Sequence, residues 1–131
     1  MGLFDLLRPK WKHSNPDVRI EAASTLSDMA TLQEMAVHDR DWFVRHRVFD
    51  VVRDRGPGDT VYAFLAKNSE DEEIRRKAVK KLKDEAALQE VANNDQYRYI
   101  REAAEHRLEE LRSNTWGEKA PGPPDSATTA R

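Results

Sequence analysis

Apolar residues recur along this chain with the spacing of one face of an α-helix. The pattern starts from four aliphatic residues, each followed directly by an arginine: Val18, Val44, Ile74 and Ile100. It continues four residues later at Ala22, Val48, Ala78 and Ala104, and eight residues later at Leu26, Val52, Leu82 and Leu108. Residues at i, i+4 and i+8 lie on one side of a helix. The pattern therefore predicts four helices, each with a single apolar stripe.

A shorter helix is predicted before each of these four. Apolar residues stand twelve and eight positions before three of the aliphatics, in the pairs Leu32 and Ala36, Tyr62 and Ala66, and Leu88 and Ala92. In the first unit the same positions hold Leu6 and Lys10, and Pro9 cuts the helix short. We expect residues 1–12, which begin "MGLFDLL", to form a cap helix over the open end of the first unit.

The unit of short helix, turn and longer helix is repeated four times. The aliphatic residues are 26, 30 and 26 positions apart, and residues 17–36 and 73–92 are identical at nine of twenty positions. We assign the four extra residues of the middle spacing to a loop insertion, "RGPG" at residues 55–58. One such unit cannot bury its own apolar stripe, so the units are expected to stack around one continuous core.

Polar residues mark the predicted helix starts. Asn15, Asp41 and Asp71 each stand three residues before an aliphatic, where an N-cap is expected, and Pro16 follows at the first helical position. Asp28 and Asp84 are placed to cap the second and fourth short helices.

This repeat, "VR…A…L.D…L…A…D", resembles the HEAT and HEAT-like repeats, including the short type found in phycobilisome lyases. The resemblance covers residues 3–112 and implies an all-α fold, a right-handed α-solenoid of about four short helix-pair repeats. The units are shorter than the roughly 40–47 residues usual for HEAT repeats. The leucine-rich variant repeat, of similar length, is the structural alternative.

The resemblance also implies a structural role for the repeated arginines. HEAT-like proteins commonly pair this arginine with a repeat aspartate in a ladder between units, and helical spacing places the arginine at the edge of the core. The implied ladder consists of Arg19, Arg45, Arg75 and Arg101 with Asp28, Asp54 and Asp84.

The C-terminal end has a different composition. From Ser113 the sequence reads "SNTWGEKAPGPPDSATTAR", with three prolines and two glycines. Such a segment cannot bury enough apolar area to offset its chain entropy. We therefore expect one domain over residues 1–113 and a disordered tail over residues 114–131, in which Trp116 is either loosely docked or part of a short linear motif.

Composition narrows the remaining possibilities. The chain lacks cysteine, which excludes disulfides and thiolate chemistry, and it has no apolar run of the roughly 20 residues that a membrane span needs. Its net charge of −2 favours no class of partner. We expect a cytoplasmic monomer that needs no cofactor and no membrane.

Enzymatic function is not expected. The histidines His13, His38, His46 and His106 do not form the paired His-Glu doublets that HEAT-like iron hydroxylases use as metal ligands. The sequence also has neither a Gly-rich phosphate loop nor a serine nucleophile motif. We predict no catalytic residues and no metal site.

Two groups of residues are candidates for partner binding. Helical spacing predicts a basic column on the concave face of the longer helices: His46, Arg47, Arg53, Arg76, Lys77, Lys80 and Lys83. The starts of two longer helices predict an aromatic edge: Trp42, Phe43, Tyr97 and Tyr99. A solvated charged face and packing around the turns are the structural alternatives.

These groups favour a non-enzymatic interaction or scaffold module that binds an acidic protein surface on its concave face. The alternative is a nucleic-acid-binding protein whose basic column contacts backbone phosphates. A third hypothesis is an accessory subunit of a lyase or hydroxylase system.

Overall fold

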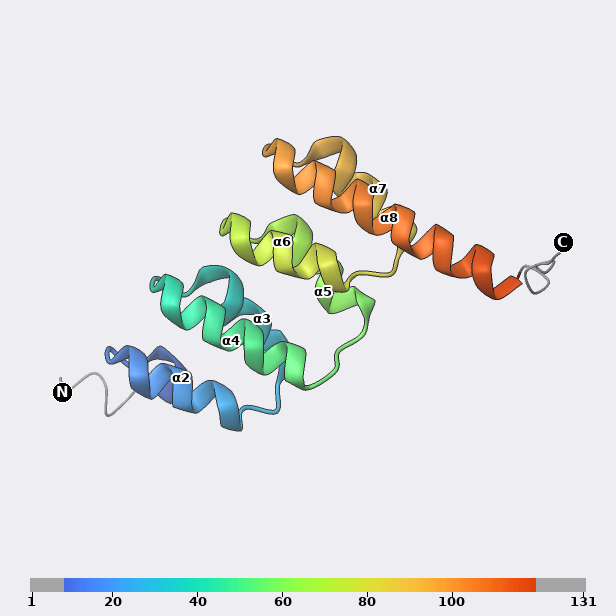
Figure 1. Ribbon diagram of the computed structural model, residues 1–131. Helices are drawn as coiled ribbons and strands as arrows, with labels where there is room; N and C mark the ends of the chain where they lie inside the picture. The colour runs from blue at the N-terminus through green and yellow to red at the C-terminus, as the bar shows by residue number, and fades with distance from the viewer. Residues whose placement is uncertain (1–8, 120–131) are drawn as a thin grey trace, which may run out of the picture.

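The computed structural model describes the backbone of residues 9–119 and the side chains of residues 9–114. All secondary-structure elements in this range are helical, which confirms the all-α prediction. After a single 3-10 turn, η1 (Lys10–Lys12), the chain forms seven α-helices (Figure 1). These are α2 (Pro16–Thr25), α3 (Met29–His38), α4 (Trp42–Asp54), α5 (Asp59–Asn68), α6 (Glu72–Lys81), α7 (Glu85–Asn94) and α8 (Arg98–Lys119).

The helices form a row of hairpins. α3 packs on α4, α5 on α6 and α7 on α8, while η1 packs on α2 in the first unit. Across hairpins, α2 contacts α4 and α6 contacts α8, whereas α3, α5 and α7 follow one another on the other side. Two layers result, with consecutive units side by side along an elongated row (Figure 1). The backbones of α4 and α6 approach each other less closely than those of α2 and α4 or of α6 and α8.

The predicted caps are largely confirmed. Asn15, Asp28, Asp71 and Asp84 each accept a hydrogen bond from a backbone amide in the first turn of the helix that follows. Asp41 precedes α4 as predicted, but its side chain forms no capping hydrogen bond. Its carboxylate instead accepts a hydrogen bond from Arg19. At this position the Asp41 carboxylate therefore joins two units without capping its own helix.

The second helix of a unit is not always the longer one. α2 and α6 have 10 residues each, like α3, α5 and α7, whereas α4 has 13 and α8 has 22. α2 and α6 end where Leu26 and Leu82 adopt extended backbone angles, although the Leu82 side chain stays fully buried. The apolar stripe thus continues past the last helical residue of these units.

The four extra residues of the middle spacing are divided between a helix and a loop. α4 is longer than α2 and α6 by three residues, since it has 13 and they have 10. The link at residues 55–58 is one residue longer than the link at residues 26–28. Gly56 lies in the left-handed region with φ 61°, a conformation that costs other residues about 1–2 kcal/mol. The predicted insertion is therefore real, but only part of it is loop.

The predicted stripes form the core. Val44, Val48 and Val52 of α4 are fully buried, and so are their counterparts at the start and middle of α6 and α8. Val18 is only half-buried, because it belongs to the first unit of the row. Trp11 packs against the same core from η1. The predicted cap residues 1–8 lie outside the described residues.

α8 extends beyond the boundary expected from the sequence. The helix continues through residues 114–119, although the domain was expected to end at residue 113. The rest of the predicted tail, residues 120–131, and the Trp116 side chain lie outside the described part of the chain. Between residues 9 and 119 no helix has the length and apolar character that crossing a membrane requires.

Core packing of the short helices can be tested on α5. Leu65 is fully buried between the layers, so Leu65→Ala should lower the free energy of unfolding by about 2–5 kcal/mol through lost burial and a residual cavity. Thr60 lies exposed on the same helix, and Thr60→Ala should change stability by no more than about 0.5 kcal/mol. Urea denaturation of both variants measures the difference, and equal stabilities would contradict this packing.

Candidate interaction surface on the α4, α6 and α8 layer

Each repeated arginine closes the turn that precedes its own helix. The Nη1 atoms of Arg19, Arg45, Arg75 and Arg101 donate to the backbone carbonyl six residues earlier, at distances of 2.6–2.9 Å. Those carbonyls belong to His13, Asp39, Ser69 and Asp95. Because this contact recurs in all four units, the arginines fix the geometry of the turn rather than forming an exposed binding array.

Arg19, Arg45 and Arg75 also reach forward to an aspartate of the next unit. Arg19 donates from Nε to Asp39 at 2.9 Å and from Nη2 to Asp41 at 2.8 Å, and its side chain is only 2% exposed. Arg75 repeats the contact with Asp95 at 2.8 Å. Burial lowers the pKa of Arg19, but the hydrogen bonds and charges of Asp39 and Asp41 outweigh it and raise the pKa. The guanidinium therefore stays charged and fully paired.

The aspartates implied by the family resemblance are not the partners. Asp28 and Asp84 cap α3 and α7, and Asp54 accepts from its neighbour Arg53. The physical reason is position: Arg19 lies in the first turn of α2, whereas Asp28 follows the C-terminal end of that helix. The ladder instead uses aspartates of the turn between the two helices of the next unit.

The ladder changes at the middle junction, between α4 and α6. Arg19 and Arg75 each find a carboxylate twenty residues ahead, at Asp39 and Asp95. The position equivalent to Asp39 and Asp95 at this junction is Ser69. It lies 24 residues after Arg45, because the insertion adds four residues. The Ser69 hydroxyl still accepts from the amide two residues on, as Asp39 and Asp95 do, but it has no charge for Arg45.

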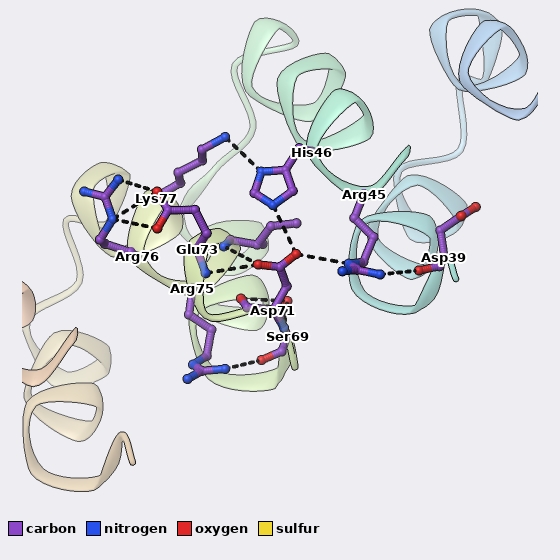
Figure 2. A network of polar contacts seen from close by, with 10 residues as sticks. Asp39, Arg45, His46, Ser69, Asp71, Glu73, Arg75, Arg76 and Lys77 are labelled. Atoms are coloured by element: carbon purple, nitrogen blue, oxygen red, sulfur yellow. Dashed lines mark hydrogen bonds and ion pairs between the residues drawn. The ribbon is translucent and has the colours of Figure 1, made fainter. Parts of the chain in front are cut away.

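Arg45 consequently turns to Asp71, which becomes the centre of a polar network (Figure 2). Asp71 Oδ2 lies 3.1 Å from Arg45 Nε and 3.0 Å from His46 Nε2, and its Oδ1 accepts from the amides of Glu73 and Ile74. Burial raises the pKa of Asp71, but His46, Arg45 and the amide of Ile74 together lower it below its usual value. Arg45 is 21% exposed, so this junction is wetter than its neighbours.

His46 connects this network to α6. Its Nδ1 lies 3.1 Å from the Lys77 ammonium, on the opposite side of the ring from Asp71 (Figure 2). A lysine has only protons to donate, so Nδ1 must accept and Nε2 must donate to Asp71. Both contacts are satisfied by a neutral His46 with its proton on Nε2.

Most of the predicted basic column is engaged within the protein. Arg76 binds Glu73 through two nitrogens, and this hydrogen bond lowers the pKa of Glu73 and raises that of Arg76. Arg53 pairs with carboxylates on either side of it, Asp50 and Asp54. These pairs neutralise the middle of the column, which the sequence alone does not show.

The other members of the column differ in their surroundings. Lys77 lies 5.7 Å from the centroid of the Phe49 ring, and Arg47 lies 5.9 Å from that of Phe43. Lys80 and Lys83 are exposed and form no ion pair within residues 9–119. The structure therefore leaves the uncompensated charge of the column near the C-terminal end of α6.

The predicted aromatic edge is exposed, in two separate pairs. Trp42 and Phe43 meet edge to face at the start of α4, and Tyr97 and Tyr99 meet at the start of α8, each pair with centroids 6.0 Å apart. Trp42 is 64% exposed, the most of any large apolar side chain described. The first turn of α6 lies between the two pairs.

Contacts with α6 hold the second pair in place. The Arg75 guanidinium lies 5.6 Å from the Tyr97 ring centroid. Tyr99 forms a hydrogen bond with Glu72. Slight burial is the larger cause of the raised pKa of the Tyr99 hydroxyl, and this hydrogen bond is the second. The tyrosines are thus positioned by α6, whereas the Trp42 ring packs edge to face against Phe43 and His46 of its own helix.

Sequence reasoning missed Phe64 and Ser69. Phe64 is exposed on α5, in the layer opposite the aromatic edge. Ser69 was detectable, because alignment of the units places it against Asp39 and Asp95. Lys81 belongs with Lys80 and Lys83 at the end of α6 but falls outside the helical positions used to define the column.

Comparison of this chain with protein-family models, with curated proteins and with solved structures gave no match. The resemblance to HEAT-like repeats therefore stays a prediction from the repeat itself. No group of three or more metal-ligating side chains gathers in the part of the chain that the structure describes.

The role of Asp71 gives a pH-dependent prediction. Its folded-state pKa lies below the unfolded value of about 3.9, so the stability it provides is complete well above that pH and disappears as pH falls through the folded value. Asp71→Asn should lower the free energy of unfolding by about 1–3 kcal/mol at pH 6, and the difference from the parent should shrink towards pH 3.

Urea denaturation at both pH values measures this effect. The matched control is Glu70→Gln, which removes a neighbouring exposed carboxylate and should have little effect at either pH. A difference between Asp71→Asn and the parent that is the same at pH 6 and pH 3 would contradict the role of the carboxylate charge.

Proposed function

We propose that this protein is a non-enzymatic interaction module, a right-handed α-solenoid of short HEAT-like repeats that binds a partner protein along the α4, α6 and α8 layer. The row of hairpins and the 26-, 30- and 26-residue spacing of the repeat support the solenoid. Solenoids of stacked helix pairs present extended surfaces suited to binding other macromolecules.

The observation that supports partner binding best is the exposed aromatic edge. All four residues of the edge are exposed: Trp42, Phe43, Tyr97 and Tyr99. Leaving large apolar side chains in water costs free energy. Tryptophan and tyrosine dominate the energetics of protein interfaces, and pre-positioned side chains lose less entropy on binding. The two tyrosines are already held by α6, so they are suited to act as anchors.

The chemistry of the partner follows from the charges on the same layer. Arg47 lies near Phe43, and Lys80 and Lys83 lie further along the same layer without a compensating carboxylate in the described residues. A partner with an apolar contact patch flanked by acidic residues complements both features. Charges of this kind mainly accelerate and orient association, while the aromatic contacts hold the complex.

The aromatic edge is tested by capture of partners from native lysate treated with nuclease. Trp42→Ala combined with Tyr99→Ala should abolish capture of a partner that the parent protein retains, because each hot-spot truncation costs about 2 kcal/mol or more. Phe64→Ala is the matched control, since Phe64 is an exposed aromatic on the opposite layer. Loss of the partner with Phe64→Ala, or its retention by the double variant, would contradict the proposed surface.

A second candidate function is nucleic-acid binding by the exposed cations. The observation in its favour is that Arg47, Lys80 and Lys83 lie on one layer without ion pairs in the described part of the chain. Against it, His46, Arg53, Arg76 and Lys77 are engaged by other groups of the protein. Few cations therefore remain to contact phosphates.

Salt dependence separates the two candidates. With about three phosphate contacts on duplex DNA, the affinity should fall by roughly one and a half decades between 50 and 200 mM salt. Fluorescence anisotropy with mixed-sequence DNA and RNA measures this slope. Our proposal expects no detectable nucleic-acid binding at 50 mM salt, and a steep salt-dependent affinity would favour the second candidate instead.

A further inference from the structure

An open pocket lies at the opposite end of the α6 helix from the aromatic edge. It has a volume of about 650 Å³, within the range usual for small-molecule sites. Its walls come from the link after α4, from the start of α5, from the end of α6 and from α8: Pro57, Gly58, Asp59, Tyr62, Lys80, Lys81, Lys83 and Arg107. The pocket thus joins three consecutive units.

The insertion at the middle junction builds one wall of this pocket. Its residues include Pro57 and Gly58, and the chain turns towards the pocket at Gly56, whose φ of 61° other residues rarely adopt. The links at residues 26–28 and 82–84 lack these residues. The pocket is therefore a local departure from the repeat and not a consequence of stacking alone.

The pocket has a strong excess of positive charge. Four cationic side chains face one carboxylate, Asp59, which already accepts two contacts from the Lys83 backbone amide at 3.0 and 3.1 Å. Arg107 donates to the Leu82 carbonyl at 2.8 Å and contacts Glu110 at 3.4 Å. The three lysine ammonium groups have no ion pair within the described residues. Like charges so close together repel one another unless an anion lies between them.

Tyr62 provides an independent sign that a ligand belongs here. The side chain lines the pocket and is only 7% exposed, yet its hydroxyl forms no hydrogen bond within the described part of the chain. A hydroxyl that lines a pocket and has no partner in the described residues is available to donate a hydrogen bond to a bound molecule. Burial, and to a lesser extent the charge of Asp54, raises the pKa of the Tyr62 hydroxyl more than the charge of Arg53 lowers it. The hydroxyl therefore keeps its proton and remains a hydrogen-bond donor at neutral pH.

We propose that this pocket binds the phosphate group of a small phosphomonoester, with Lys80, Lys81 and Lys83 supplying charge and Tyr62 donating a hydrogen bond. A phosphomonoester carries about −1.5 to −2 charges at neutral pH and offers three acceptor oxygens, which match three ammonium groups and a hydroxyl that all donate. The terminal group of a monoester suits a concave pocket, whereas a nucleic-acid backbone runs along a surface. This site goes beyond the proposed function, because the aromatic edge lies at the other end of the helices.

Binding is measured by isothermal titration calorimetry and by amide chemical shifts, with inorganic phosphate and O-phosphoserine as probes. Ionic strength is held constant with sodium chloride, so that general screening does not contribute. We expect saturable binding of both probes, with shifts confined to residues around 57–62, 80–83 and 107. Lys80→Gln with Lys83→Gln should weaken binding at least tenfold, and Tyr62→Phe should weaken it roughly tenfold by removing one charge-assisted hydrogen bond.

Two controls separate the pocket from the overall charge and from the aromatic edge. Arg98→Gln removes a cation on the exposed surface of α8, paired with Glu102, and should bind phosphate as the parent does. Trp42→Ala should also bind phosphate normally, so failure of the interaction surface and failure of this pocket are distinguishable. Circular dichroism melting confirms that each variant is folded.

Three outcomes would overturn the proposal. The first is no saturable binding of either probe at constant ionic strength. The second is an unchanged affinity in Tyr62→Phe, or a loss in Arg98→Gln as large as that in the lysine variant. The third is binding of a DNA duplex that depends on Lys80 and Lys83 while neither small probe binds, which would assign these lysines to a phosphodiester backbone.

Discussion

The structure depends on one interaction, the forked contact of a buried arginine with the turn behind it and the unit ahead. One arm of Arg19 or Arg75 holds the carbonyl six residues earlier, and the other holds an aspartate twenty residues later. Apolar burial drives the stacking of units, but it is non-directional. The planar guanidinium, which binds in one geometry, sets the register between consecutive hairpins. Its net contribution to stability is small beside that of the core, because burying the charges is costly.

The middle junction shows what happens when this contact is altered. Ser69 keeps the local turn but lacks the carboxylate, so Arg45 and His46 share Asp71 and the α4 and α6 backbones stay further apart. The four extra residues fall at the same junction, as a longer α4 and a longer link. Both departures from the repeat thus occur together, and the two features that we consider functional lie at the two ends of α6.

Much of the fold was predictable from sequence, because helices, caps and core all follow from spacing. In α2, α4, α6 and α8 the first helical residue lies two positions before the repeated valine or isoleucine, as the spacing predicts. Helix ends were less predictable: the stripe at Leu82 continues in extended backbone, so periodicity does not locate the last helical residue. Likewise, α8 continues through residues 114–119, where the composition does not indicate a helix.

The candidate site was predictable only in part, because exposure and pairing are properties of the assembled surface. Helical position placed Arg76 and Lys80 together, but it could not show that Arg76 is bound to Glu73 while Lys80 has no such partner in the described residues. The ladder partners were misassigned for a related reason, since aspartate recurs at both ends of the helices. The sequence shows that an aspartate recurs in each unit, but only the structure shows which of the aspartates lies at the helix end that faces the arginine.

The wider α4–α6 junction has a consequence for the cooperativity of folding. In a linear array each unit is stabilised by its neighbours alone, so the weakest interface sets how independently the two sides open. Here that interface divides the described chain into an N-terminal block up to α4 and a C-terminal block from α5 onwards, joined chiefly through α3 and α5. Amide hydrogen exchange reports such opening directly. Because one apolar cluster runs through the junction, we expect the two blocks to unfold together, with local opening starting between α4 and α6.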